Sequence, residues 1–215
     1  MRATPEIHLN TLLERYPALT TCAEDIQMAY NTLKQSFVNN GKLLVCGNGG
    51  SAADAEHIVG ELMKGFLLKR ALNPEQRARF TTHFPHVGSY LADHLQYGLP
   101  AIALTGHPSL ATAFANDVGA DMLFAQQVFV YGNPQDVLLG ISTSGNSRNV
   151  LHALQVAKVK GLKTLGLSGG TGGQMRSLCD TLICVPAHET AHVQEYHLPV
   201  YHALCSMLEA ASFAC

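Results

Sequence analysis

The sequence lacks long apolar runs, clusters of basic residues and closely spaced cysteine pairs. No apolar run approaches the roughly 20 residues of a membrane span, which argues against a transmembrane helix. The first ten residues contain Arg2, Glu6 and His8 and no apolar core, so no signal peptide is expected. A formal net charge of −2 without a Lys/Arg cluster disfavours direct binding of nucleic acid. We therefore expect a cytosolic protein with neither nucleic acid nor membrane as a partner.

Charged residues are also scarce, at 14%, whereas 47% of the residues are hydrophobic. A chain of 215 residues with this composition can bury a full core, and we expect one globular domain over residues 1–215. None of the six cysteines forms a C-x-x-C pair, and Cys46 and Cys184 lie in apolar, strand-like runs. We expect the cysteines to be structural, with Cys215 free to be exposed.

Hydrophobic periodicity predicts strands that alternate with helices along most of the chain. Two helical patterns, over residues 7–16 and 19–39, form an N-terminal helical arm within residues 1–40. Beyond it, strands are predicted at 42–46, 101–104, 137–141, 163–167 and 181–184, and helices at 51–67, 109–116, 122–131, 146–160 and 190–211. This alternation predicts an α/β fold with a parallel sheet covered on both faces. Ligands of such sheets bind beyond the carboxyl ends of the strands.

The pattern breaks over residues 67–100, which we interpret as an insertion. Proline, histidine and glycine are scattered there through weakly periodic sequence. So long a segment inside a compact domain is often a lid or an interface element. Within it, the spacing of His83 and His86 suits a metal, but solvent-facing histidines in a polar loop are the better interpretation.

The segment 137-VLLGISTSGNSRNV-150 is the most informative, because an apolar strand runs into a hydroxyl-rich turn that opens a helix. Four side chains of the turn supply hydroxyl donors: Ser142, Thr143, Ser144 and Ser147. Gly145 lets the backbone approach a ligand closely, and free N–H groups at a helix start stabilise an anion. We interpret the turn as a phosphate loop; the alternative is a Ser-rich turn that only caps the helix.

A second glycine-rich turn, within 47-GNGGSAADAEHIVGEL-62, follows the first predicted strand. Its glycines allow positive φ and bring backbone N–H groups close to a ligand, but their G-x-G-G spacing is not the dinucleotide fingerprint. On the next helix, His57 and Glu61 are four residues apart and project from one face. This pair could ligate a metal, or the carboxylate could act as a general base. The alternative is a surface pair without chemistry.

The last predicted helix lies in 189-ETAHVQEYHLPVYHALCSMLEA-210. Gln194, Leu198 and His202 step by four residues there, so Gln194 and His202 can face one cavity. His197 lies about 140° around the helix from His202 and is a less natural partner for it.

A further polar pair, Asn116 and Asp117, stands in 114-FANDVGAD-121. These side chains either cap a helix or hydrogen-bond sugar hydroxyls. The residues alone do not separate these two interpretations.

Together the motifs GNGGSAADAEH…E, AND, ISTSGNS and HVQEYHLPVYH resemble the sugar isomerase (SIS) family, and within it the phosphoheptose isomerases. The resemblance runs from about Gly41 to the end of the chain in the same motif order. It implies an SIS-type three-layer αβα sandwich with a five-stranded parallel sheet, and N-terminal helices that build a homotetramer. It also implies an aldose–ketose isomerase that converts sedoheptulose 7-phosphate to D-glycero-D-manno-heptose 7-phosphate through an enediol.

The resemblance also implies a role for each matching residue. The residues that would contact the sugar are Asn48, Gly49, Gly50, Ser51, Asn116, Asp117 and Gln194. Those that would hold the phosphate are Ser142, Thr143, Ser144 and Ser147. The ligands of one Zn²⁺ per subunit would be His57, Glu61, Gln194 and His202. Glu61 and His202 also match the acid/base pair, with Glu61 as base on one carbon and His202 moving the second proton.

Two features depart from the family pattern. The insertion over 67–100 is longer than expected, and Ala191 stands where family members often carry an acidic residue. One alternative function is a non-catalytic SIS protein that senses a sugar phosphate or binds the replication initiator. Retention of all four polar positions in the proposed metal set argues against it. Another alternative is an isomerase or lyase that acts on a different phosphosugar.

Overall fold

The protein is described by a computed structural model over residues 4–213, so the prediction for Cys215 lies outside the described residues. Its centre is a sheet of five parallel strands in the order β2-β1-β3-β4-β5. The strands are β1 (Leu43–Cys46), β2 (Ala101–Ala103), β3 (Val137–Ile141), β4 (Lys163–Gly169) and β5 (Thr181–Val185). Every residue of β1 and β3 is buried, which is why these strands are apolar runs without alternation. The predicted five-stranded α/β fold is confirmed.

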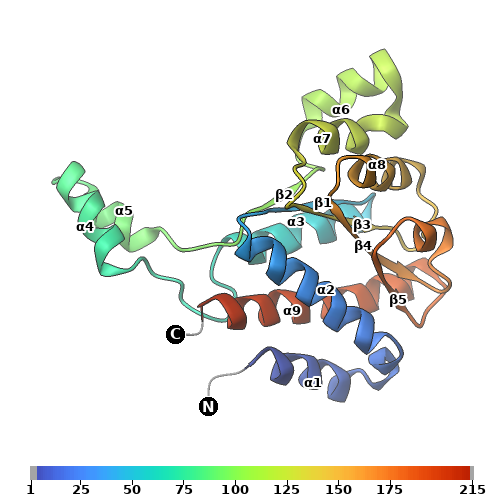
Figure 1. The fold of residues 1–215 in the computed structure, drawn as a ribbon, viewed down its shortest axis with the longest axis horizontal. Coiled ribbons are helices and arrows are strands. Elements are labelled where there is room, and N and C mark those ends of the chain that lie inside the picture. The colour runs from blue at the N-terminus through green and yellow to red at the C-terminus, as the bar shows by residue number, and fades with distance from the viewer. Residues whose placement is uncertain (1–3, 214–215) are drawn as a thin grey trace.

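Helices cover both faces of the sheet (Figure 1). One face carries α2 (Ala23–Val38), α3 (Gly50–Met63) and α9 (Thr190–Phe213), and the other carries α7 (Leu123–Tyr131) and α8 (Arg148–Val159). The alternating side chains of β1 join the two cores, since Leu43 and Val45 pack toward α2, α3 and α9 while Leu44 and Cys46 pack toward α7 and α8. The first helix, α1 (Pro5–Arg15), packs on the outer side of α9.

The strand order places a topological switch point at β1, where the chain changes direction across the sheet. From β1 the chain continues to β2 on one side, whereas β3 lies on the other side of β1. Ligands of open α/β sheets bind at such a switch point, beyond the carboxyl ends of the strands. The loops that leave β1 and β3 there are the two glycine-containing turns identified in the sequence.

The insertion contains two helices that the sequence pattern did not predict. They are α4 (Pro74–His83) and α5 (Gly88–His94), and Figure 1 shows them as an arm that projects from the body. The start of α4 carries a helix signal, because the Asn73 side chain accepts a hydrogen bond from the Gln76 amide at 2.8 Å and Pro74 follows it. An antiparallel bridge between Ala71 and Gln96 closes the base of the arm.

The remaining elements differ from the predicted bounds mainly at their ends. The expected helix over 19–39 is a 3₁₀ segment, Pro17–Cys22, followed by α2, and α3 ends at Met63 instead of residue 67. The helix expected at 109–116 is α6 (Pro108–Phe114), continued by a π turn, Ala115–Gly119, and a 3₁₀ turn, Ala120–Met122. A last 3₁₀ turn, Gly173–Ser177, precedes β5. No helix within residues 4–213 is both long and apolar enough to span a membrane.

Candidate functional site

The hydroxyl-rich turn after β3 folds into a compact cradle at the start of α8. The buried Ser142 hydroxyl lies 2.9 Å from the Ser147 hydroxyl and 3.4 Å from the Ser147 amide. Gly145 has φ +67°, and a Cβ there would lie 2.0 Å from the Gly172 carbonyl oxygen, so the turn requires glycine. This packing holds the turn against the loop that follows β4.

Ser144 is the hydroxyl in this cradle that faces solvent. Its Oγ accepts a hydrogen bond of 3.3 Å from the Asn146 amide, which leaves the hydroxyl proton free to donate. Thr143 is half-buried beside it. An exposed hydroxyl donor at a helix start suits a phosphate group.

An amide pair connects the turn after β1 to the start of α8. The Asn48 side chain donates to Asn149 Oδ1 at 2.9 Å, and the Asn149 side chain donates to Asn48 Oδ1 at 2.8 Å. Asn149 also accepts a hydrogen bond from the Val150 amide at 3.0 Å. Asn149 was missed in the sequence, because its partner lies 101 positions away and only the strand order brings the turns together.

Gln194 lies beside the start of α3. A Cβ added to Gly50 would lie 2.2 Å from Gln194 Nε2, so the amide group packs directly against the glycine backbone. Gln194 and His202 are eight residues apart on α9, about 12 Å along the helix axis. Within residues 4–213, no hydrogen bond joins Gln194 to His57, Glu61 or His202.

The proton-transfer and metal candidates converge farther along α3 and α9. His57 Nε2 lies 3.3 Å from Glu61 Oε1 and 3.4 Å from His202 Nε2. The other carboxylate oxygen, Glu61 Oε2, accepts from Lys64 Nζ at 2.8 Å. The structure therefore brings together His57, Glu61 and His202 and adds Lys64, a partner three residues from Glu61 that the sequence pattern did not indicate.

Burial shifts the pKa of one member of this cluster, His202. Burial lowers the pKa of His202, and the neighbouring His57 lowers it further, whereas Glu61 opposes the shift. His202 is therefore neutral around pH 7 and has one nitrogen that donates and one that accepts. Such an imidazole can exchange a proton with a substrate hydroxyl.

A tyrosine and an aspartate lie behind His57. The Tyr201 hydroxyl donates to Asp54 Oδ1 at 3.3 Å and lies 3.0 Å from His57 Nδ1. Burial, together with the nearby Asp54 carboxylate, raises the pKa of Tyr201, so its phenol keeps its proton. Burial likewise raises the pKa of Asp54, against the opposing effects of the Tyr201 hydrogen bond and His57.

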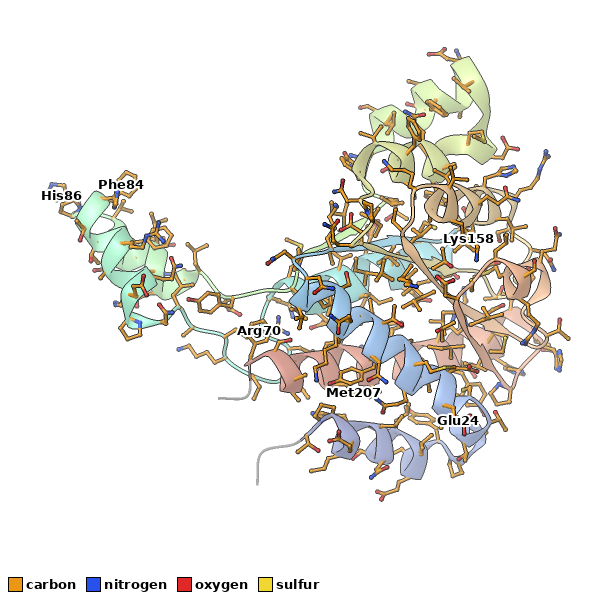
Figure 2. All side chains as sticks on the ribbon, viewed as in Figure 1. Glu24, Arg70, Phe84, His86, Lys158 and Met207 are labelled. Atoms are coloured by element: carbon orange, nitrogen blue, oxygen red, sulfur yellow. The ribbon has the colours of Figure 1, made fainter. Side chains whose placement is uncertain are left out.

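A buried ion pair fixes the C-terminal end of α3, where Glu61 stands. Arg70 Nε lies 2.8 Å from Glu209 Oε1, and both side chains are almost completely buried. The Arg70 guanidinium also donates to the carbonyl oxygens of Leu62, at 2.7 Å, and Glu61, at 3.3 Å. The Glu209 carboxylate accepts from the backbone amides that follow α3: Phe66, Leu67 and Leu68. Figure 2 shows Arg70 where the arm joins the body.

The donor types around His57 fit zinc. Zinc in proteins takes imidazole nitrogen and carboxylate oxygen, and ligands about 2.0–2.1 Å from a tetrahedral ion lie roughly 3.3–3.4 Å apart. The distances from His57 Nε2 to Glu61 and to His202 match that separation. Within residues 4–213, however, no three such side chains form a ready-made metal site, since Glu61 and His202 each approach His57 but not each other. Gln194 lies outside this group.

Other predicted site residues lie apart from the cluster. Asn116 and Asp117 are exposed in the π turn after α6, where the Asn116 side chain donates to Asp117 Oδ1 at 2.8 Å. Within residues 4–213, no hydrogen bond connects them to either glycine-containing turn. Ala191 is exposed at the start of α9. In the arm, His83 lies at the end of α4 and not in a loop, and its Nδ1 is 2.8 Å from the Arg79 carbonyl oxygen.

Comparison with known proteins gives consistent matches over most of the chain. A family model described as the SIS domain matches residues 9–83 and 80–169. A phosphoheptose isomerase from Rhodospirillum rubrum is 39% identical over 201 residues, which cover 94% of this chain and 93% of the relative. The structure of a phosphoheptose isomerase from Neisseria gonorrhoeae matches with a TM-score of 0.73 and 33% identity, covering 94% of this chain and 95% of that one. The corresponding enzyme from Francisella tularensis gives 0.72 and 31%, with 93% of both chains covered.

Proposed function

Since this chain belongs to the SIS domain family, among its phosphoheptose isomerases, we propose that Glu61 and His202 carry the proton transfers of sedoheptulose 7-phosphate isomerisation. The product is D-glycero-D-manno-heptose 7-phosphate. The observation that carries the proposal is the convergence of Glu61 and His202 on His57, at 3.3 and 3.4 Å. A carboxylate and a neutral imidazole in one cluster are the groups that an enediol mechanism needs.

In the proposed mechanism, Glu61 removes a proton from C1 of the ketose, next to the C2 carbonyl. The electrons of the C–H bond form the C1–C2 double bond of the enediol, and the carbonyl oxygen takes up a proton. His202 moves the proton between the two oxygens, giving one to O2 and taking one from O1. Glu61 then returns its proton to C2, which leaves an aldehyde at C1.

The remote phosphate anchors the sugar at the other end of the site. The hydroxyl of Ser144, with Ser142, Thr143 and Ser147 around the start of α8, supplies donors for its oxygens. Asn48 and Gly50 line the sugar between the two ends, where Gln194 packs. Binding energy from the phosphate orients C1 and C2 toward the proton-transfer groups.

We include one Zn²⁺ per subunit in the proposal, held by His57, Glu61 and His202. The fit of the donor types and of the two donor separations supports this choice. The family resemblance also assigns Gln194 to the metal, and in this structure the Gln194 amide packs against Gly50 at the start of α3. Bound there, zinc would act as a Lewis acid that stabilises negative charge on a sugar oxygen.

Turnover of sedoheptulose 7-phosphate, measured after chelation and after zinc is added back, tests this proposal. We expect chelation to abolish turnover and zinc to restore it in the wild type. His202→Ala should stay inactive in zinc, whereas the control His192→Ala, on an exposed histidine of the same helix, should match the wild type. Turnover that survives His202→Ala would contradict the proton-transfer assignment. Binding of the sugar phosphate without any turnover would favour a non-catalytic SIS protein.

The proposal also covers location and assembly. We propose that the protein works in the cytoplasm as a homotetramer and takes no nucleic acid as partner. The exposed apolar side chains on α7 and on the arm support an assembly, because large exposed apolar patches mark interaction sites.

A further inference from the structure

The hydrogen-bonded chain behind His57 has a direction. Tyr201 is 2% exposed, and its hydroxyl bridges Asp54 Oδ1 at 3.3 Å and His57 Nδ1 at 3.0 Å. The other oxygen of Asp54, Oδ2, is buried and accepts no hydrogen bond within residues 4–213. A phenol has one proton and an ionised carboxylate has none, so an ionised Asp54 can only accept the hydrogen bond from Tyr201.

When the phenol donates to the Asp54 carboxylate, its oxygen can only accept from His57. His57 must then carry its proton on Nδ1, which leaves the lone pair of Nε2 free. That lone pair faces the two other members of the cluster, since Nε2 lies 3.3 Å from Glu61 and 3.4 Å from His202. Histidine ligands of metals commonly donate their second ring N–H to such an outer partner, which sets the tautomer and the ring orientation.

We propose that Asp54 and Tyr201 are positioning residues that fix His57 in the Nδ1–H tautomer and present its Nε2 to the metal and the substrate. This inference rests on the proposed zinc site, and it assigns a role to two residues outside that site. The arrangement spans two helices, because Asp54 and His57 stand on α3 whereas Tyr201 stands on α9. The chain therefore also fixes the alignment of His57 with His202, the neighbour of Tyr201.

The opposite direction is the competing arrangement. A protonated Asp54 would donate to Tyr201, the phenol would donate to His57 Nδ1, and the ring proton would move to Nε2. His57 would then donate to Glu61 Oε1 and would have no lone pair for a metal. The two arrangements place the proton on different nitrogens, which makes them distinguishable by spectroscopy.

Nitrogen-15 NMR of the zinc-free protein reads the tautomer directly, at alkaline pH where imidazoles are neutral. The His57 signals are assigned by their loss in His57→Gln. We expect Nδ1–H in the wild type and a shift toward Nε2–H in Tyr201→Phe, which keeps the ring but removes the bridge. Tyr196→Phe, on a half-buried tyrosine of the same helix, should leave the spectrum unchanged. An Nε2–H tautomer in the wild type, or no change in Tyr201→Phe, would overturn the proposal.

Zinc affinity, measured by competition with a chromophoric chelator, provides the second readout. Loss of an outer-shell partner of a metal-bound histidine weakens metal binding by about 10- to 100-fold, and we expect this for Tyr201→Phe and Asp54→Ala. The double variant should lose no more than either single variant, because both break the same chain. Wild-type affinity in Tyr201→Phe would refute the positioning role. If the wild type itself bound no zinc, the metal part of the proposed function would fail, while the NMR result would still judge the tautomer.

Discussion

The two oxygens of the Glu61 carboxylate have different partners. Oε1 faces His57 at 3.3 Å, and Oε2 accepts from Lys64 at 2.8 Å. Lys64 therefore places a positive charge beside Oε2, whereas Oε1 faces His57 and the other members of the cluster. The carboxylate that we propose for proton transfer therefore lies between an imidazole and an ammonium group.

At the phosphate end, Ser144→Ala should weaken sugar-phosphate binding without unfolding the protein. Its exposed hydroxyl has a free proton, so the variant loses a charge-assisted hydrogen bond of roughly 1.5–3 kcal/mol, or about 10- to 150-fold in dissociation constant. Calorimetric titration with the sugar phosphate measures this loss. Ser177→Ala, on an exposed serine bonded to Gln174, is the control. Equal affinities of the two variants would refute the phosphate loop.

The sequence identified residue types better than their partners. The four-residue spacing of His57 and Glu61 follows from helix geometry and is readable without a structure. The bridge from Asp54 to Tyr201 is not readable, because it depends on how α3 and α9 pack across 147 positions of sequence. The eight-residue spacing of Gln194 and His202 places both on one stripe about 12 Å apart along the helix, but it does not show that the Gln194 amide packs against Gly50.

At the scale of elements, the Arg70–Glu209 pair anchors the end of α3 to α9. Glu209→Gln should destabilise the fold by about 3–5 kcal/mol, since it leaves a buried guanidinium without its counter-charge. Urea unfolding measures the change. Glu195→Gln, on an exposed residue of the same helix, should cost far less. Equal midpoints for the two variants would show that the pair does not anchor the helix.

The same pair predicts how stability depends on pH. Burial alone would raise the pKa of Glu209, but hydrogen bonds from Phe66, Leu67 and Arg70 and the charge of Arg70 lower it overall. A carboxyl group with a lowered folded pKa contributes stability above its ordinary value of 4.5 and loses it as the pH falls through the folded value. The stability difference between wild type and Glu209→Gln should therefore shrink below pH 4.5. A difference that stays constant in acid would contradict this reasoning.

Elements with a clear hydrophobic pattern were predicted well, whereas the two helices of the projecting arm, α4 and α5, were not. The strand β3 matches its predicted bounds, because a run of five buried apolar residues has no competing interpretation. In contrast, α4 buries no residue, so it has no apolar stripe for periodicity to detect. Its cap signal, Asn73 followed by Pro74, was present but lay in the weakly periodic segment interpreted as an insertion.

At the scale of the whole molecule, the arm projects from the body with apolar side chains exposed. Phe84 is 55% exposed and Tyr90 is 62% exposed, and on α7 both Phe129 and Val130 are 63% exposed. Figure 2 shows Phe84 near the tip of the arm. Burial of these side chains against other copies of the chain would explain why residues that are exposed in the single chain are apolar.

Light scattering tests the proposed assembly. We expect a particle of about four times the 23.1 kDa chain mass, and a smaller one when Phe84 and Tyr90 are both replaced by glutamate. Replacing Val159, an exposed residue of α8, by glutamate should leave the mass unchanged. A monomeric wild type would contradict the tetramer, and an unchanged mass in the arm variant would remove the arm from the interface.

The most direct test of the central claim is NMR of sedoheptulose 7-phosphate incubated in deuterated water with zinc-loaded protein. We expect formation of an aldose phosphate, with solvent deuterium at the carbon next to the carbonyl where the proton held by Glu61 exchanges. Glu61→Gln should bind the sugar phosphate but form no product and exchange no proton. Wild-type turnover in Glu61→Gln would contradict the enediol mechanism with Glu61 as its base.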